Sequence, residues 1–331
     1  MTSPRLLEVD GLTVRFSTSR GEVYGTDDVS FTLDHGETLG FVGESGSGKS
    51  VTATSLIGIH PPLTRVRTTG SAKLEGRELL TMSEAQLRAV RGAEIGYVFQ
   101  DPLTALDPSL PVGRQIVETL RVHTDLDKTA ARQRTLELLD LVGIPNAAGS
   151  ADNYPDQFSG GMRQRILVAL AISCRPKLLI ADEATTALDP TVQTQILALL
   201  RTLCRELRMA MILITHDFGV VAATCDSVQV MYAGRIVERG PVAEVLSRPG
   251  HPYTAGLIRL APRFELMEHH RLIPIPGRAP TVIRPEPGCR FAPRCDLADD
   301  RCRQEVPRLS ETAAHTHACW RTSLTLDRSH P

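Results

Sequence analysis

The hydrophobic and polar positions along the chain change pattern several times, and each pattern predicts a different element. Residues 6–33 alternate between apolar and polar side chains in short segments such as LTVRF and VSFTL, which is typical of antiparallel strands. The segment TLGFV is a predicted strand that runs into a Gly-rich turn and a helix, and KLLIA and MAMILIT are short, continuously apolar runs of the kind found in strands buried on both faces. We therefore expect an antiparallel β-region followed by a parallel sheet in an α/β fold.

Helical periodicity dominates residues 102–175, which lie between TLGFV and KLLIA. RQIVETL and ARQRTLELLDL place apolar residues at helical spacing within residues 102–175, and no convincing strand interrupts them. This stretch is predicted to be a helical insertion in the parallel sheet, which gives two compact lobes. A further helix is expected after Pro190, a residue well suited to the first turn of a helix.

The composition changes after Pro241, where prolines punctuate a loop-rich tail. We place a domain boundary near Arg248, which gives domains 1–248 and 249–331. Four of the 7 cysteines follow Gly288. The others lie in apolar surroundings, and we interpret them as small core residues. They are Cys174, Cys204 and Cys225.

Charge and hydrophobicity exclude several classes of protein. With Lys+Arg 37 against Asp+Glu 38 the net charge is -1, so a basic surface for nucleic acid is not expected. Hydrophobic residues make up 42% of the chain and support a real core, but no apolar run approaches the roughly 20 residues that span a bilayer. Because no signal segment is recognisable, we expect synthesis in the cytosol, where structural disulfides are rare. Membrane contact is then expected only through other proteins.

The segment GESGSGKS follows the predicted strand TLGFV and leads into an apolar helix, which is the setting of a phosphate-binding P-loop. Its glycines let backbone N–H groups point at phosphate oxygens, the lysine reaches the terminal phosphates, and the following serine hydroxyl ligates Mg²⁺. A Gly/Ser-rich linker is the alternative, but a linker would not end in Lys-Ser at the start of an apolar helix. The predicted nucleotide-binding residues of this segment are Gly43, Glu44, Ser45, Gly46, Ser47, Gly48, Lys49, Ser50 and Val51.

A second segment, FSGGMRQR, stands just before a predicted helix and narrows the choice among P-loop proteins. Together with the P-loop it resembles the ABC ATPase family. Ser159, Gly160 and Gly161 match the signature of that family, whereas Phe158 and Met162 stand where Leu and Gln are commoner. The resemblance implies that the signature of one subunit closes over ATP held by the P-loop of another, so that dimerisation completes the active site. Alone, Ser-Gly-Gly would indicate only a capped helix start.

Two adjacent acids, Asp182 and Glu183, follow the apolar run in KLLIADE, at the carboxyl end where open α/β sheets bind ligands. The resemblance implies that Asp182 holds Mg²⁺ and that Glu183 orients and deprotonates the attacking water. Such a pair alone is often a solvated strand end. The P-loop upstream and the segment TALD, which ends at the nucleotide-site residue Asp189, favour the catalytic interpretation. Ala184 stands beside the acids, where family members frequently have Pro.

Further positions take their roles from the resemblance. His216, after the run MILIT, matches the residue that contacts the γ-phosphate and the catalytic water. Gln100, after IGYVF, matches the glutamine that contacts Mg²⁺ and water and marks the loop facing the membrane subunit. Phe16 is expected to stack on adenine, with Tyr24 as the second candidate and core packing as the alternative for both. The implied fold is an ABC-type nucleotide-binding domain: a RecA-like core with an antiparallel β subdomain and a helical subdomain.

The segments SGGMRQR, ADEATTALD and HPYT resemble the dipeptide and oligopeptide importers within that family. The resemblance implies an ATP-hydrolysing subunit at the cytoplasmic face of the inner membrane, with two permeases, an extracytoplasmic solute-binding protein and a related but different second ATPase subunit. Nickel and glutathione transporters of the same branch remain alternatives. A soluble ABC protein of DNA repair or ribosomes would normally carry coiled-coil insertions or two fused ATPase domains, and neither is seen. Glu183 and His216 argue against a sensing regulator that does not need hydrolysis.

The tail segment CRFAPRCDLADDRC, followed by HACW, orders its cysteines as in the C-terminal region of that branch. These cysteines are Cys289, Cys295, Cys302 and Cys319. Their thiolates suit a [4Fe–4S] cluster or a structural Zn²⁺. We favour iron–sulfur because zinc ribbons usually present cysteine pairs two residues apart. Zinc with His315 or His317 as substitute ligands, and free thiols, are the alternatives. A bound metal would order a tail poor in regular structure, so we expect a stabilising role and not electron transfer.

Overall fold

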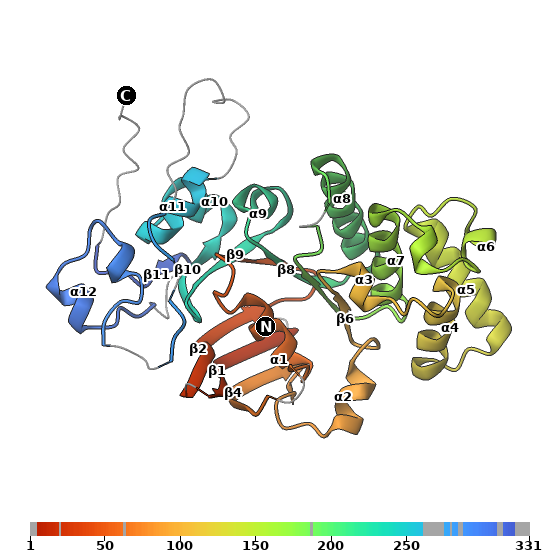
Figure 1. The fold of residues 1–331 in the computed structure, drawn as a ribbon, viewed down its shortest axis with the longest axis horizontal. Helices are drawn as coiled ribbons and strands as arrows, with labels where there is room; N and C mark the ends of the chain where they lie inside the picture. The colour runs from red at the N-terminus through yellow and green to blue at the C-terminus, as the bar shows by residue number, and fades with distance from the viewer. Residues whose placement is uncertain are drawn as a thin grey trace. The chain divides into compact units, whose positions relative to one another are not determined.

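The computed structural model describes residues 5–19, 21–61, 64–185, 188–260, 275–278, 280–283, 287–309 and 314–321. The chain forms two compact units (Figure 1). The first unit comprises Met1–Leu6, Leu33–Thr38 and Thr81–Ile214, and the second comprises Leu7–Thr32, Leu39–Leu80 and Thr215–Pro331. The boundary predicted near Arg248 is not one of these divisions and stays a prediction.

The sheet of the first unit consists of the parallel strands β6 (Ile95–Val98), β7 (Leu178–Asp182) and β8 (Ala210–Thr215), with β7 in the middle. Every residue of β7 and β8 is buried, as their apolar runs predict. Because the strands are parallel, the loops that follow β6 and β7 leave the sheet at the same edge.

Most helices of the first unit lie between β6 and β7 in the sequence, in agreement with the helical pattern of that stretch. The helices of this unit are α2 (Glu84–Val90), α3 (Pro102–Ala105), α4 (Val112–His123), α5 (Lys128–Leu141), α6 (Ala147–Ser150), the 3-10 turn η1 (Pro155–Gln157), α7 (Gly160–Ile172) and α8 (Pro190–Leu207). Helix α5 begins after Asp127, whose carboxylate accepts a hydrogen bond from Ala130 N at 2.8 Å. Helices α4, α5 and α7 pack on one another (Figure 1).

The second unit contains an antiparallel sheet in the order β2-β1-β4-β5. Its strands are β1 (Leu7–Thr18), β2 (Gly21–Leu33), β4 (Val66–Leu74) and β5 (Arg77–Glu78). The alternating residues 6–33 thus form the antiparallel structure that their pattern predicts. In the same unit, β3 (Thr38–Val42) pairs in parallel with β9 (Ser227–Tyr232), and β10 (Arg235–Pro241) pairs with β9 in antiparallel fashion.

The C-terminal region packs onto β9 and β10 within the second unit. Its elements are α10 (Val242–Ser247), α11 (Pro252–Leu260), the 3-10 turn η2 (Ala292–Arg294), α12 (Asp300–Gln304) and β11 (Thr316–His317), and α1 (Lys49–Leu56) and α9 (Phe218–Thr224) belong to the same unit. Strand β11 pairs with β10. The fully buried carboxylate of Glu238 on β10 accepts hydrogen bonds from Gly250 N at 2.7 Å and His251 N at 2.9 Å, and it contacts His315 Nε2 at 2.8 Å. These contacts anchor the tail, because a buried carboxylate is costly unless its oxygens are paired.

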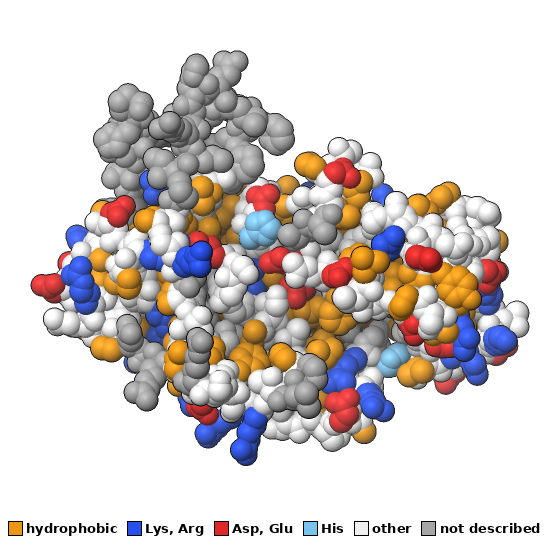
Figure 2. Space-filling model, viewed as in Figure 1, with side chains coloured by type: hydrophobic (Ala, Val, Ile, Leu, Met, Phe, Trp, Pro, Cys, Tyr) orange, Lys and Arg blue, Asp and Glu red, His pale blue; other side chains and the backbone are white. Residues whose placement is uncertain are grey.

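Acidic and basic side chains are interspersed over the face shown in Figure 2, in keeping with the nearly neutral net charge of -1. In the parts of the chain that the structure describes, no helix combines the length and the apolar character needed to cross a bilayer.

Candidate nucleotide site

The P-loop connects β3 to α1 in the second unit. Gly43 and Gly48 have φ angles of 158° and 103°, and a side chain on either would collide with the backbone oxygens of Met231 and Gly25. No side chain caps the first turn of α1, since Gly48 holds the cap position. The N–H groups at this helix start are therefore directed at the loop, as anion binding requires.

Lys49 is buried inside the P-loop. Its Nζ donates to Gly43 O at 2.8 Å, to Glu44 O at 3.0 Å and to Ser47 Oγ at 3.4 Å. Lys49 therefore fixes the curl of the loop from within, while Ser45, Gly46 and the neighbouring Ser50 stay at or near its surface. This arrangement keeps an ammonium group next to the position that terminal phosphates take in a P-loop.

The two acids lie at the carboxyl end of β7 in the first unit, and each has a hydrogen-bond partner from the β6 segment. Tyr97 on β6 donates its hydroxyl to Asp182 Oδ2 at 2.7 Å. Gln100 donates from Nε2 to Glu183 Oε2 at 3.0 Å. Burial and the Asp182 charge raise the pKa of Tyr97, so its hydroxyl stays protonated and serves as a donor. The structure thus brings Gln100 and Glu183 together, as a shared catalytic role requires.

Glu183 has an unusual backbone with φ at +46°, in the left-handed region that non-glycine residues seldom adopt. Its N–H donates to Ile214 O on β8 at 3.0 Å. The strand pairing of β7 therefore continues to the residue where the chain turns. A strained conformation maintained by such a bond is a frequent feature of functional sites.

The signature segment begins α7 in the first unit. Ser159 caps the helix, accepting a hydrogen bond at Oγ from Met162 N at 3.3 Å, so the capped helix start considered from the sequence is present. Gly160 is exposed. Gly161 lies close to α8, where a Cβ atom would be 2.8 Å from Val192 Cγ1. The exposed N-terminal turn of α7 is thus available to a partner, and the glycine behind it permits close packing of two helices.

The remaining predicted residues are placed as follows. In the first unit, exposed Asp189 caps α8 by accepting from Thr191 N at 3.1 Å and Val192 N at 3.0 Å. Thr186 and Ala187 of the TALD segment lie outside the described residues. His216 is exposed and directly follows β8 in the sequence.

The two aromatic candidates both lie in the second unit, with different neighbours. Phe16 lies beside Gly25, at a point that Val51 at the start of α1 also approaches. Tyr24 instead has the guanidinium of Arg15 4.7 Å from its ring centroid. Because Phe16 is near the P-loop helix and has no such cation over its ring among the described contacts, it remains the preferred candidate for adenine.

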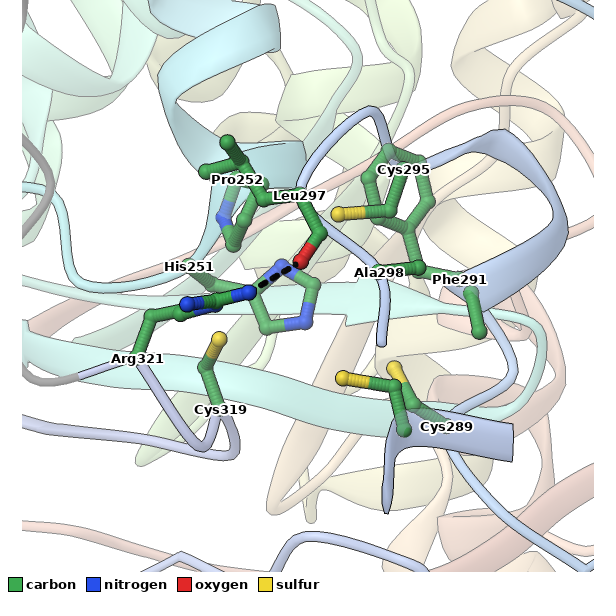
Figure 3. Close-up of a pocket in the computed structure, with 11 residues that line it drawn as sticks. His251, Pro252, Cys289, Phe291, Cys295, Leu297, Ala298, Cys319 and Arg321 are labelled. Atoms are coloured by element: carbon green, nitrogen blue, oxygen red, sulfur yellow. Dashed lines mark hydrogen bonds between the residues drawn. The ribbon is translucent and has the colours of Figure 1, made fainter. Parts of the chain in front are cut away.

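The four tail cysteines line one pocket of the second unit, together with His251 and Phe291 (Figure 3). Figure 3 shows sulfur atoms of Cys289, Cys295 and Cys319 directed into the same space. All four are free thiols, and burial raises the pKa of Cys289, Cys295 and Cys319. Among the described residues, however, no group of three His, Cys, Asp or Glu side chains converges on a position for a metal ion. Those described residues therefore offer no preformed zinc site.

The earlier cysteines differ in burial. Cys204 is buried at 5% exposure, and burial raises its pKa to about 12, as expected of a core residue. Cys174 and Cys225 are half-buried. Cys204 is therefore the core residue that was predicted, whereas Cys174 and Cys225 are only partly buried.

Comparison with known proteins bears on the whole chain. The profile of the family described as ABC transporter matches residues 26–186, and that of the oligopeptide/dipeptide transporter C-terminal region matches residues 237–302. A putative peptide import ATP-binding protein of Brucella abortus (strain 2308) is 50% identical over 96% of this chain and 95% of its own length. The oligopeptide transport ATP-binding protein OppD of Haemophilus influenzae is 47% identical over 95% of this chain and 97% of its own length. The chain belongs to the ABC transporter family.

Solved structures agree with this assignment. A dimeric structure of the ATP-binding cassette MJ0796, bound to ADP and Pi, matches with a TM-score of 0.64 at 24% identity and covers 71% of this chain and 98% of that chain. CbiO1 of Clostridium perfringens, described as part of the ABC transporter complex cbiONQ, matches with a TM-score of 0.62 at 28% identity over 74% of this chain and 92% of that chain. The predicted fold and the predicted class of enzyme, an ATPase, are confirmed for this ABC protein.

Sequence reasoning missed two residues at this site of the ABC protein. Tyr97 was part of the recognised strand IGYVF, but its role depends on the register that places it opposite Ile180, two residues before Asp182. Side chains two residues apart face the same side of a strand, so this register brings the hydroxyl to the carboxylate. The second is Arg294 in the tail, which contacts Glu44 of the P-loop. Its only signal in the sequence was its place as the second arginine of CRFAPRC, directly before Cys295.

Proposed function

We propose that this ABC protein is the ATP-hydrolysing subunit of an importer for dipeptides and oligopeptides. The observation that carries the proposal is similarity over nearly the whole chain to proteins named for peptide import or oligopeptide transport, including a match to the C-terminal region of that group. Nickel and glutathione are the alternative solutes. Family membership supports the ATPase role, whereas the names of the relatives support the solute.

ATP binds at the P-loop, with Lys49 and the N-terminus of α1 facing its phosphates and Phe16 stacking on adenine. Hydroxyl, carboxylate and amide oxygens are the ligands that Mg²⁺ prefers, and Ser50, Asp182 and Gln100 offer one of each. These residues would hold Mg²⁺, which neutralises charge on the phosphates when bound. The Tyr97 hydroxyl at 2.7 Å orients the Asp182 carboxylate for this role.

Hydrolysis depends on Glu183, which takes a proton from the attacking water. The Gln100 amide at 3.0 Å holds the Glu183 carboxylate in place, and an acceptor oxygen of that carboxylate remains for the water. His216 contacts the γ-phosphate and the same water. Because phosphoryl transfer to water needs little covalent chemistry from the protein, most of the catalytic effect comes from positioning and from stabilising phosphate charge.

The site is completed by a second, related ATPase subunit that contributes its own signature helix. The exposed Gly160 and the capping Ser159 at the start of α7 support this, because a helix N-terminus free of bulky side chains binds anions well. Asp189, which the family resemblance places at the nucleotide, caps the start of α8. The same face of the partner is expected to contact ATP held by this chain.

The ATPase subunit lies at the cytoplasmic face of the inner membrane, and two permeases and an extracytoplasmic solute-binding protein complete the transporter. Phe99 and Leu103 flank Gln100 and are 38% and 60% exposed. Large apolar side chains so exposed next to a catalytic residue are suited to a protein partner. Contact there would transmit the state of the nucleotide site to the permeases.

The test of the proposed solute is uptake by cells that lack this gene. We expect the deletion to abolish uptake of labelled dipeptides and oligopeptides, and complementation with the natural gene to restore it. A Lys49→Ala variant should fail to restore uptake although the protein is present. Loss of nickel or glutathione uptake with unchanged peptide uptake would contradict the peptide assignment.

We also propose that the four tail cysteines hold a [4Fe–4S] cluster. The support for this proposal is that all four thiols line one pocket, and four cysteine thiolates are the ligand set of such a cluster. Cys289, Cys295, Cys302 and Cys319 would each bind one iron, and the cluster would order the tail. Coordination would also deprotonate the thiols.

Chemical analysis after anaerobic purification tests the cluster. We expect about four iron and four sulfide per chain, the composition of such a cluster, and loss of both when Cys295 is replaced by serine. Cys174→Ser is the matched control, since Cys174 is a half-buried thiol of the other unit, and it should keep the full iron content. Zinc without iron, or no metal, would contradict this proposal.

A further inference from the structure

Glu44, the second residue of the P-loop, is bound by two residues of the C-terminal region. The guanidinium of Arg294 donates from Nη1 to Glu44 Oε2 at 2.6 Å and from Nη2 to Oε1 at 2.9 Å. The Glu44 N–H donates to the Tyr253 hydroxyl at 2.8 Å. All three residues belong to the second unit. The side chain and the backbone of this P-loop residue are thus both fixed from the tail.

Arg294 is itself firmly held. Its side chain is only 5% exposed, and it donates to the carbonyl oxygens of Pro276 at 2.6 Å and Ile275 at 3.3 Å. The guanidinium also lies over the rings of Tyr232 and Phe291, 5.7 Å and 5.9 Å from their centroids. A bidentate pair with a planar, immobilised guanidinium fixes a carboxylate in direction as well as distance.

The opposite side of Glu44 is held by the P-loop itself. Lys49 Nζ donates to the Glu44 carbonyl at 3.0 Å. The N–H, the carboxylate and the carbonyl of one residue are therefore all engaged, the first two by the tail and the third by the lysine that faces the phosphates. A shift of Glu44 would move its carbonyl and change the position of Lys49.

We propose that Arg294 is a positioning residue for ATP binding, which acts through Glu44 to hold the P-loop in its binding conformation. The proposal rests on the proposed nucleotide site. It gives the C-terminal region a direct role at the P-loop in addition to a structural one. Arg294 also immediately precedes Cys295, and Phe291 lines the cysteine pocket, so the segment that forms this pocket is the segment that holds the P-loop.

A double-mutant cycle with purified full-length chain tests the proposal through the dissociation constant for MgATP. Arg294→Ala and Glu44→Gln are each expected to weaken binding about tenfold, the size typical of a strongly coupled pair. The double variant should be no weaker than either single variant, because both remove the same constraint. In the assembled transporter, the KM for ATP should rise while kcat at saturating ATP is retained, since neither Arg294 nor Glu44 has a proposed role in the hydrolysis step.

Arg301→Ala is the matched control. This arginine of the same tail lies over the Trp320 ring at 3.6 Å and pairs with Glu305, so its loss disturbs the tail without touching Glu44. Its affinity for ATP should equal that of the natural chain. If Arg294→Ala does not fold, Glu44→Gln tests the same contact. This variant should fold, because the Glu44 side chain is 31% exposed and Arg294 keeps its carbonyl acceptors. Thermal unfolding checks that each variant is folded.

The outcomes separate this inference from the proposed nucleotide site. Unchanged affinity in folded Arg294→Ala and Glu44→Gln, additive losses in the double variant, or an equal loss in Arg301→Ala would each overturn the positioning role. If Lys49→Ala also leaves ATP binding intact, the nucleotide site itself is wrong. If Lys49→Ala abolishes binding while the Arg294 and Glu44 variants bind normally, only the positioning role is wrong.

Discussion

Replacing Glu183 by glutamine is expected to lower ATP turnover at the site held by this chain about a thousandfold, within the range attributed to general-base catalysis, while ATP binding persists. The substitution removes the charge that accepts a proton from water and keeps the size of the side chain. It also preserves the contact with Gln100, because the amide oxygen of glutamine can accept the bond that now measures 3.0 Å. The left-handed backbone and the bond from residue 183 to Ile214 O should be unaffected.

The measurements are phosphate release by the assembled transporter and equilibrium binding of MgATP. ATP that binds without being hydrolysed should also hold the two ATPase subunits together, which size-exclusion chromatography detects as an ATP-dependent dimer. Glu206→Gln is the control, since Glu206 is an exposed acid on α8 of the same unit. Undiminished phosphate release by the Glu183 variant would remove this residue from its proposed role.

The sequence allowed much of the fold to be predicted because its strongest patterns are local. Most of KLLIA lies in β7 and most of MAMILIT lies in β8, and every residue of these two strands is buried. A β-strand of apolar residues followed by a glycine-rich loop and Lys49 at the start of a helix has few other ways to fold. The identity of the P-loop and of the signature could therefore be recognised from short segments, each with its own structural context.

The contacts that the sequence left out join residues far apart in the chain. Tyr97 and Asp182 are 85 positions apart, and Glu44 and Arg294 are 250 apart. The first contact depends on the register between β6 and β7, and the second on how the tail folds back over β9 and β10. Neither register nor tail packing is encoded in local periodicity. The structure was therefore needed to identify which residues pair with one another, although the candidate site residues could be named from the sequence.

Replacing Gly160 by glutamate is expected to slow hydrolysis at the partner's nucleotide site without affecting this chain's own ATP binding. Gly160 is exposed at the first turn of α7, and a Cβ atom there would meet only Leu188 Cδ2 at an ordinary 3.7 Å. The chain should therefore fold normally. A carboxylate at this helix start would repel the γ-phosphate of ATP held by the partner and offset the favourable helix dipole. We expect turnover at that site to fall about a hundredfold or more, comparable to the loss of a key electrostatic donor.

Phosphate release and the ATP-dependent dimer provide the measurements. Gln157→Glu adds the same charge just before α7, where it can still accept the 2.7 Å bond from Tyr154 N, and it should retain turnover. Adding Gly160→Glu to the Glu183→Gln variant should abolish the dimer that Glu183→Gln stabilises. A stable dimer and normal turnover would show that α7 does not face the partner's nucleotide.

Mixing the two single variants separates the identity of the partner from the shared site. Glu183 acts on ATP held by its own chain, whereas Gly160 acts on ATP held by the partner. A pair made of one Glu183→Gln chain and one Gly160→Glu chain would therefore contain one intact site if identical chains paired. Because we propose two different ATPase subunits, no turnover should return on mixing. Recovery of turnover would contradict the heterodimer. It would at the same time support a nucleotide site shared between subunits, because only complementation across the dimer restores an intact site.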